Sequence, residues 1–242
     1  MLHQPDPTKK PDMAEGIKAI RKLHLRVIAE SGLTGADEML YPGNHPYLDD
    51  LLGYVAIGAR STENQQHRLT ASGISMPAGF KNPMCGDIQV MLNSIRAAQQ
   101  SHTFAYNGWE VTTDGNQFAH AILRGSVDKY GKAFPNYHFE DLWETIRLYE
   151  ETDAKNRAII IDTNHSNSAR IFSEQPRIAR EILSSRKLSP SINEYVRGLL
   201  IESYIVEGSQ GVEENVYGKS ITDPCLGWEA TEKLILEIAD SV

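Results

Sequence analysis

The sequence has little cysteine and no long apolar run. Its 242 residues include two cysteines, Cys85 and Cys225, which form no CxxC pair. Such sparse usage is typical of a reducing compartment and argues against a disulfide-linked scaffold. No stretch approaches the roughly 18 apolar residues that a membrane-spanning helix needs. The polar, proline-rich start MLHQPDPTKKPDM resembles neither a signal peptide nor an anchor. We therefore expect a soluble, cytoplasmic protein without a membrane partner.

Clustered positive charge is also absent. The formal net charge is −8, and no basic run or stripe of basic and aromatic residues is present. Nucleic-acid surfaces depend on clustered Lys and Arg, so we expect no nucleic-acid partner. A small anionic substrate is not excluded, because a few converging basic side chains bind one locally. No linker, fixed-period repeat or low-complexity segment divides the chain, and we expect one domain over residues 1–242.

Short apolar runs, typical of buried strands, alternate with segments of helical periodicity. The clearest run is RAIIID at 157–162, and further strand candidates are found at 34–40, 54–59, 76–81, 119–124 and 198–202. Helices are predicted at 12–32, 62–73, 87–95, 139–149, 168–183 and from 229 onward, with a short helix from Pro46 to Leu52. Residues 102–106 are strand-like, and residues 110–113 followed by the turn signal Asp114-Gly115 indicate a hairpin.

This alternation indicates an α/β fold with a parallel sheet covered by helices. About six strand–helix units can be counted, fewer than the eight of a closed (β/α)8 TIM barrel. The carboxyl ends of parallel strands face one side, which carries the active site in such folds. Polar residues follow the apolar runs there: Arg60, Lys81, Arg124, Asp162, His165 and Glu202, with Asp223 further on.

These residue types suggest a definite chemistry. Arginine and lysine in a partly desolvated pocket bind phosphate and carboxylate groups. One histidine with two carboxylates suits a divalent metal such as Mn, Fe or Zn. A metal beside a phosphorylated carboxylate substrate suggests a lyase, aldolase or synthase that polarises a carbonyl.

Each residue taken alone has a simpler explanation. A single His165 is more often a loop or capping residue, and Lys81 or Arg60 more often a surface charge. Glu202 is less easily dismissed, because a buried carboxylate needs a partner. Cys225 reads as a small buried residue rather than a nucleophile. The prediction of a functional site depends on these residues occurring together at strand ends. The opposing hypothesis is a structural or interaction module whose pocket is vestigial.

Six segments resemble class I 3-deoxy-7-phosphoheptulonate (DAHP) synthases. They are GARSTENQQHR (58–68), AGFKNP (78–83), AILRG (121–125), DTNHSNS (162–168), IESYIVEGSQ (201–210) and YGKSITDPCLGWE (217–229). The resemblance covers essentially the whole chain. It implies a transferase that condenses phosphoenolpyruvate with erythrose 4-phosphate, giving DAHP and phosphate. This is the first step of the shikimate pathway, which leads to chorismate and the aromatic amino acids.

The resemblance also implies roles for single residues. Arg60 would bind phosphoenolpyruvate, Lys81 would contact its carboxylate and Arg124 its phosphate, while Glu38 would line the same site. A divalent metal (Mn, Fe, Co or Zn) would polarise the aldehyde. The ligands of this metal would be His165, Glu202 and Asp223. The catalytic residues would be Lys81, His165 and Asp223. The full-length form is expected to be a homo-oligomer, and aromatic amino acids commonly inhibit the family.

Two family motifs do not occur in this sequence. One is GPCS-like, at the end of the first barrel strand, and its Cys is a fourth metal ligand; the other is KPRT, after the second strand. We therefore expect an incomplete TIM barrel whose six strands correspond to strands three to eight, with exposed strand edges. One hypothesis is an inactive fragment. The alternative is a shortened, non-catalytic paralogue that binds a phosphorylated ligand.

Overall fold

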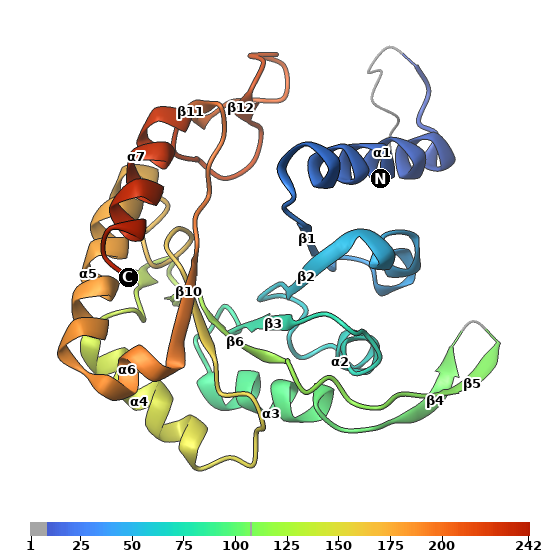
Figure 1. Cartoon of the computed structure of the whole chain (residues 1–242), viewed down its shortest axis with the longest axis horizontal. Coiled ribbons are helices and arrows are strands. Elements are labelled where there is room, and N and C mark those ends of the chain that lie inside the picture. Colours follow the sequence, from blue (N-terminus) through green and yellow to red (C-terminus); the bar gives the residue numbers. More distant parts are fainter. Residues whose placement is uncertain (1–8, 107) are drawn as a thin grey trace.

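Six parallel strands form the central sheet of this computed structural model, which describes residues 9–106 and 108–242 (Figure 1). The strands are β1 (Gly35–Glu38), β2 (Leu52–Ile57), β3 (Ala78–Lys81), β6 (His120–Leu123), β9 (Ile159–Asp162) and β10 (Val196–Leu200). Each pairs with the next in that order, so β1 and β10 are the edges of the curled sheet. The predicted α/β class and six-stranded parallel sheet are confirmed.

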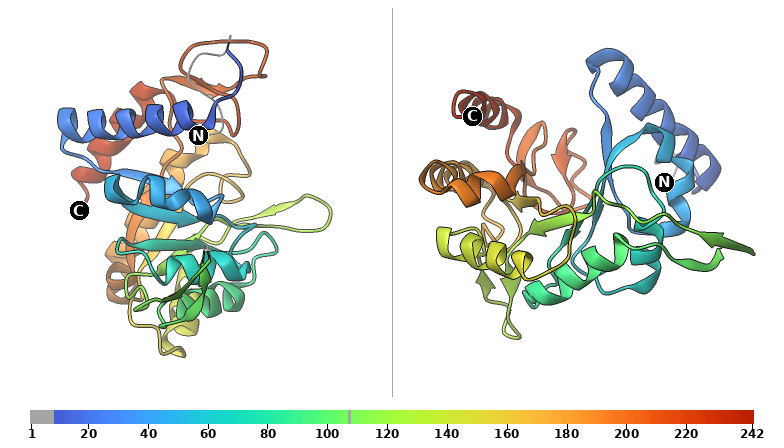
Figure 2. Two further views of the ribbon diagram at one scale, coloured as in Figure 1. Left: turned by 90° about the vertical axis from the view of Figure 1, so that its right-hand side faces the viewer. Right: turned by 60° about the horizontal axis from the view of Figure 1, so that its bottom comes forward.

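Helices cover the outside of the sheet (Figure 2). They are α1 (Met13–Ser31), α2 (Gln65–Ala71), α3 (Ile88–Ala98), α4 (Phe139–Glu150), α5 (Gln175–Leu188), α6 (Pro190–Tyr195) and α7 (Trp228–Ala239). Parallel strands need such crossovers, because each connection must return to the opposite end of the sheet. Among the described residues, no helix combines the length and apolar character that crossing a membrane requires.

Local sequence signals set several helix ends. Asp12 caps α1 by accepting a hydrogen bond from Glu15 N (3.1 Å), and Asp87 caps α3 by accepting one from Val90 N (3.0 Å). Gly32, with φ 71°, ends α1 in the left-handed conformation that glycine adopts without strain. The predicted starts and stops at these three residues are confirmed. Residues 1–8 of the proline-rich start lie outside the described residues.

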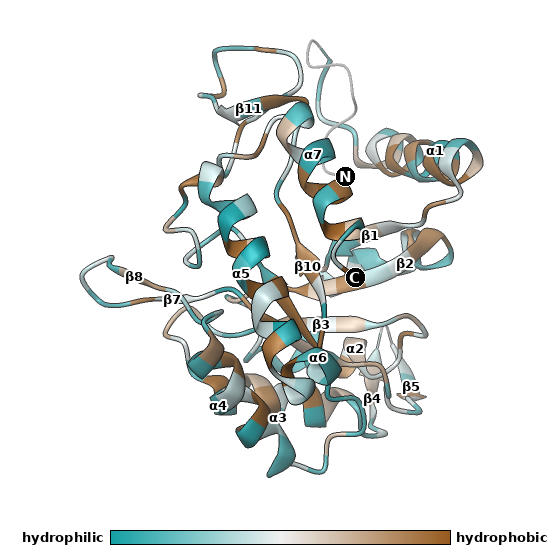
Figure 3. Ribbon diagram, turned by 60° about the vertical axis from the view of Figure 1, so that its left-hand side comes forward, coloured by the Kyte–Doolittle hydropathy of each residue, from teal (hydrophilic) through white to brown (hydrophobic). Residues whose placement is uncertain are grey.

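The main hydrophobic core lies between the sheet and its helices. β3 and β6 are buried at every position, which explains the short apolar stretches AGF and AIL within them. Met91, Leu92 and Ile95 of α3 are fully buried in the same core. Figure 3 shows hydrophobic residues along β10 and both kinds of residue along α4 and α5, as expected for amphipathic helices.

Smaller strand pairs extend from this framework. An antiparallel hairpin of β4 (Thr103–Tyr106) and β5 (Trp109–Thr112) projects away from the sheet (Figure 1). A second hairpin pairs β7 (Ser126–Val127) with β8 (Ala133–Phe134). Near the carboxyl terminus, β11 (Val206–Ser209) pairs in parallel with β12 (Lys219–Ser220). These pairs lie outside the six-stranded sheet.

Three local predictions were wrong in detail. Pro46 lies inside the 3-10 helix η1 (Pro42–Tyr47), which is followed by η2 (Asp49–Leu51), so no α-helix begins at this proline. The hairpin was expected to turn at Asp114-Gly115, but residues 109–112 pair with the preceding strand 103–106, so Asp114-Gly115 follows the hairpin. The helix expected from Ser168 begins at Gln175, after the short 3-10 helix η3 (Phe172–Glu174).

Candidate metal and anion site

Polar residues follow the carboxyl ends of the central strands, which all face one side of the sheet. Lys81 and Asp162 are the last residues of β3 and β9. Arg124 comes directly after β6, which lies between these two strands, and Glu202 comes two residues after β10. The strand order therefore brings together side chains that are far apart in the sequence.

His165, Glu202 and Asp223 form a cluster of potential metal ligands. One ligand atom from each lies within 4.8 Å of the others. His165 Nδ1 is 3.4 Å from Glu202 Oε1, and His165 Nε2 is 3.7 Å from Asp223 Oδ2. The three side chains are half-buried and come from the loop after β9, the segment after β10 and the loop before α7.

The loop after β9 holds His165 in an uncommon backbone conformation. Its φ is 47°, and Ala169 and Arg170 have φ values of 51° and 62°. This left-handed region is rarely adopted by residues with side chains, and such strain is concentrated at functional sites. Arg170 N donates to His165 O (2.8 Å), and Ser168 N donates to Asn164 O (3.3 Å). These hydrogen bonds fix the turn and also explain why no helix begins at Ser168.

Asn164 links this loop to the other two segments of the cluster. Its side-chain amide donates to Glu202 Oε2 (2.6 Å) and to Pro224 O (3.1 Å). Its backbone N–H donates to Asp162 Oδ1 (3.0 Å), and its side-chain oxygen accepts from Ser168 Oγ (2.7 Å). One buried asparagine therefore positions Glu202 relative to the segment that carries Asp223.

The electrostatics of the cluster fit a divalent cation. His165 Nδ1 is buried and has no hydrogen-bond partner among the described residues; Asp162 Oδ2 lies 2.8 Å away without the alignment of a hydrogen bond. Burial raises the pKa of the Glu202 carboxyl, and the nearby carboxylates of Asp162 and Asp223 add to this rise. Three carboxylates around one imidazole give a mixed nitrogen and oxygen donor set that a bound cation would neutralise.

Lys81 and Arg124 are buried basic residues beside this cluster. They are 8% and 4% exposed. Lys81 Nζ lies 3.2 Å from Asp162 Oδ2, and Arg124 Nη1 donates to Ser166 Oγ (3.1 Å). Burial lowers the pKa of the Arg124 guanidinium, which nevertheless remains charged in proteins. Arg124 keeps donors beyond its one serine contact, which suits it to an anion.

Three asparagines join the loops that carry these groups. Asn82 Oδ1 accepts from Arg124 N (2.9 Å) and from Asn136 Nδ2 (3.1 Å). Asn136 N donates to Asn167 Oδ1 (2.9 Å), and Asn167 Nδ2 donates to Asp162 O (2.8 Å). The network therefore connects the ends of β3, β6 and β9 and fixes the backbone beneath the site.

Arg60 and Glu38 lie at the same end of the sheet but outside this network. Both are exposed. Arg60 is in the turn after β2, and its guanidinium forms no hydrogen bond or ion pair with the described part of the chain. The Glu38 carboxylate occupies the space that a side chain at Gly58 would take. The structure thus groups five of the seven predicted site residues and leaves these two on the β1–β2 side.

Several contacts at the site were missed by sequence reasoning. Asp162 was noted as a strand-end residue, but not as the contact of both Lys81 and His165. Asn82, Asn164 and Asn167 were not singled out, although each follows closely on a strand that ends at the site. Asparagine recurring directly after apolar runs was the available signal.

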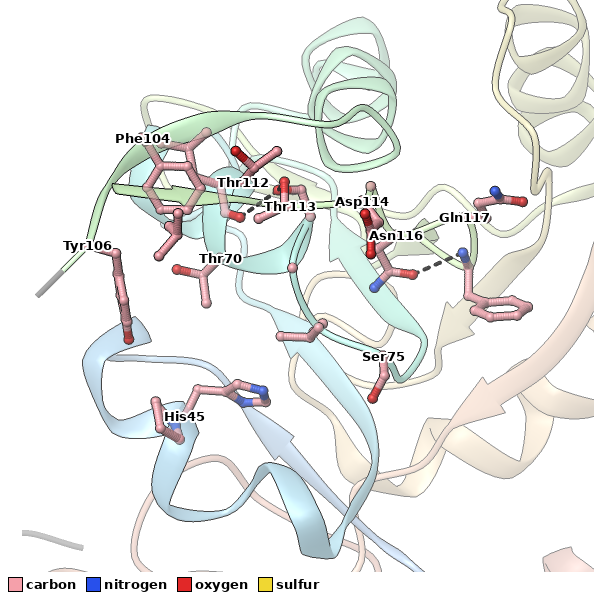
Figure 4. A pocket seen from close by; sticks show the side chains of 18 residues that line it. His45, Thr70, Ser75, Phe104, Tyr106, Thr112, Thr113, Asp114, Asn116 and Gln117 are labelled. Atoms are coloured by element: carbon pink, nitrogen blue, oxygen red, sulfur yellow. Dashed lines mark hydrogen bonds between the residues drawn. The ribbon is translucent and has the colours of Figure 1, made fainter. Parts of the chain in front are cut away.

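A separate cavity of about 630 Å³ lies near the amino-terminal ends of β2, β3 and β6 (Figure 4). Its apolar lining includes Leu69, Ile74, Phe104, Val111 and Phe118. Two polar atoms of its lining, His45 Nδ1 and Thr70 Oγ1, are buried and have no hydrogen-bond partner in the described part of the chain. None of the predicted site residues lines this cavity.

Comparison with known proteins decides the family. The model of the DAHP synthetase I family matches residues 9–236. The chain belongs to this family. As a DAHP synthetase I family member, it is 38% identical over 247 residues to the Tyr-sensitive phospho-2-dehydro-3-deoxyheptonate aldolase of Escherichia coli (strain K12). That alignment covers 98% of this chain and 66% of the relative. The resemblance inferred from the sequence is confirmed.

Two further comparisons agree with this DAHP synthetase I assignment. The Phe-sensitive enzyme of Escherichia coli (strain K12) is 35% identical over 255 residues, covering 100% of this chain and 68% of the relative. The solved phospho-2-dehydro-3-deoxyheptonate aldolase of Francisella tularensis SCHU S4 is 32% identical, with a TM-score of 0.88. That match covers 100% of this chain and 70% of the solved chain. The chain therefore spans 66–70% of the length of these relatives.

Proposed function

We propose that this chain carries the metal and phosphoenolpyruvate sites of a DAHP synthase. The reaction would join C3 of phosphoenolpyruvate to the aldehyde carbon of erythrose 4-phosphate, with water consumed and phosphate released. The observation that carries the proposal is the cluster of His165, Glu202 and Asp223, whose ligand atoms lie within 4.8 Å of one another, beside buried Lys81 and Arg124. The identity of the substrates is inferred from membership of the family.

The basic residues would hold phosphoenolpyruvate. Arg124 would bind its phosphate, because a buried guanidinium offers several donors to one group of oxygens. Lys81 would contact the carboxylate, and Arg60 would add a contact from the β2 side. Glu38 would line the same space. These cations would orient the substrate and stabilise its negative charges in a partly dehydrated setting, where electrostatic interactions are stronger than in water.

His165, Glu202 and Asp223 would hold a divalent Mn, Fe, Co or Zn ion. When bound, such an ion supplies a Lewis acid that polarises the aldehyde oxygen. Lys81, His165 and Asp223 are the proposed catalytic residues. Asn164 would keep Glu202 in place through its 2.6 Å hydrogen bond. The strained turn after β9 would keep the imidazole facing both carboxylates.

We further propose that the six strands correspond to strands three to eight of a (β/α)8 barrel and that residues 1–242 belong to one domain. The full barrel would form a homo-oligomer. The alternative is a non-catalytic protein that uses the same basic residues to bind a phosphorylated ligand. Arg124 and the metal cluster would serve binding in either case.

The experiment that tests the function is phosphate release from phosphoenolpyruvate by the purified 242-residue chain with Mn²⁺. We expect release to depend on erythrose 4-phosphate and to be abolished by Asp223→Asn. An Arg180→Gln variant is the control, because Arg180 pairs with Glu237 on the surface. Binding of phosphoenolpyruvate without any release would favour the non-catalytic alternative.

The cavity near the amino-terminal ends of β2, β3 and β6 favours a second, regulatory function. Relatives are named for sensitivity to Tyr, Trp or Phe. The cavity combines apolar walls with the unpaired His45 Nδ1 and Thr70 Oγ1, and it lies away from the metal cluster. We infer that an aromatic amino acid binds there. Adding each amino acid to the same assay tests this, and Ile74→Trp, which fills the cavity, should remove the inhibition.

A further inference from the structure

One buried carboxylate contacts both halves of the candidate site. Asp162 is 1% exposed. Its Oδ2 lies 3.2 Å from Lys81 Nζ and 2.8 Å from His165 Nδ1. Its other oxygen accepts a hydrogen bond from Asn164 N (3.0 Å). Lys81 belongs to the proposed anion site and His165 to the proposed metal site, so the two sites meet at a single carboxylate oxygen.

The contacts of Asp162 explain how a buried carboxylate is accommodated at this position. Its Oδ2 faces the Lys81 ammonium group and the His165 ring, and Asn164 N donates to its Oδ1. A buried carboxylate needs such partners, because burying an isolated charge costs free energy. Asp162 therefore depends on a group from each of the two proposed sites.

We propose that Asp162 is a positioning residue, the shared counter-ion of Lys81 and His165, and that it sets the balance between cation and anion binding. The proposal rests on the proposed function. Its carboxylate lies 2.8 Å from His165 Nδ1, which leaves Nε2 for a cation, and its negative charge favours a cation bound to that ring. A small rotation of the imidazole would align Nδ1–H with this carboxylate, an arrangement that strengthens metal binding by histidine. The same charge offsets that of Lys81 and so weakens the attraction of the lysine for an anion.

Loss of this one charge therefore has opposite effects on the two ligands. The affinity for a divalent cation falls, because the site loses a negative charge beside His165. The affinity of the metal-free protein for an anionic substrate rises, because Lys81 is no longer neutralised. A residue that served packing alone would not separate the two affinities, since loosening of the site would weaken both.

The test measures both affinities in Asp162→Asn. Asparagine has nearly the same shape and keeps an oxygen for the Asn164 N–H, which favours folding. We expect Mn²⁺ affinity, followed by electron paramagnetic resonance of the free ion, to fall about tenfold or more. Calorimetry should show phosphoenolpyruvate binding the metal-free variant about threefold more tightly or better. Asp153→Asn removes the same charge from a surface pair with Arg96 and should change neither affinity.

A second pair of variants tests the same idea if Asp162→Asn does not fold. Lys81→Met frees Asp162 for His165 and the cation, so Mn²⁺ affinity should rise. Arg124→Met removes an equal charge that does not contact Asp162 and should raise Mn²⁺ affinity less. Parallel loss of both affinities in Asp162→Asn, or equal effects of the two methionine variants, would overturn the proposal. A wild-type chain that binds neither Mn²⁺ nor phosphoenolpyruvate would instead contradict the proposed function.

Discussion

His120 shows how burial fixes the state of a single residue inside the sheet. Its Nδ1 lies 2.8 Å from Phe118 O, which can only accept, so this nitrogen carries the proton. Its Nε2 then accepts a hydrogen bond from the Tyr54 hydroxyl (2.7 Å). Burial lowers the pKa of His120 and raises that of Tyr54. Both groups are therefore neutral in the folded protein near neutral pH.

This neutral histidine makes stability depend on pH. A histidine in the unfolded chain has a pKa of about 6.5, above that of buried His120, so below this pH the unfolded state binds more protons. The free energy of unfolding should therefore decrease as the pH is lowered below about 6.5. This residue contributes a decrease of at most about 1.4 kcal/mol per pH unit. Urea unfolding at about pH 7.5 and about pH 5.5 measures the loss, which should be smaller in His120→Gln. Equal losses in the two proteins would contradict the assignment.

At the scale of elements, the helices α1 and α3 differ in the number of their residues that are buried. Gly16 is the one buried residue of α1, whereas α3 buries Met91, Leu92, Ser94, Ile95 and Ala98. Local opening costs little free energy where few apolar contacts are lost. Hydrogen exchange should therefore be much faster along α1 than along α3 in the isolated chain. Equal protection of the two helices would show that α1 has stabilising contacts beyond those described.

The elements also show which features the sequence determines locally. β3 and β6 were predictable because strands buried on both faces need a continuous apolar run, and the Asp87 cap signals α3 directly. The delayed start of α5 was not predictable, because turns held by contacts such as Asn164 with Glu202 occupy the segment before it. Asp162 was predicted at a strand end. Its contacts with Lys81 and His165 were not predictable, because they form only when the chain folds.

At the scale of the whole molecule, the sheet distributes the site across its width. The metal cluster lies near β9 and β10, Lys81 and Arg124 lie at the centre, and Glu38 and Arg60 lie on the β1–β2 side. A substrate with a phosphate and a carboxylate fits such a spread, because its charged groups need separate partners. We therefore expect one metal position, at the β9–β10 end of the sheet.

The most direct test locates the metal itself. Crystals of the protein soaked in Mn²⁺, with data collected at the manganese absorption edge, give an anomalous map of bound ions. We expect one strong peak bounded by His165, Glu202 and Asp223, and its loss in Asp223→Asn. Absence of a peak there at saturating Mn²⁺, or a peak coordinated by other residues, would contradict the account.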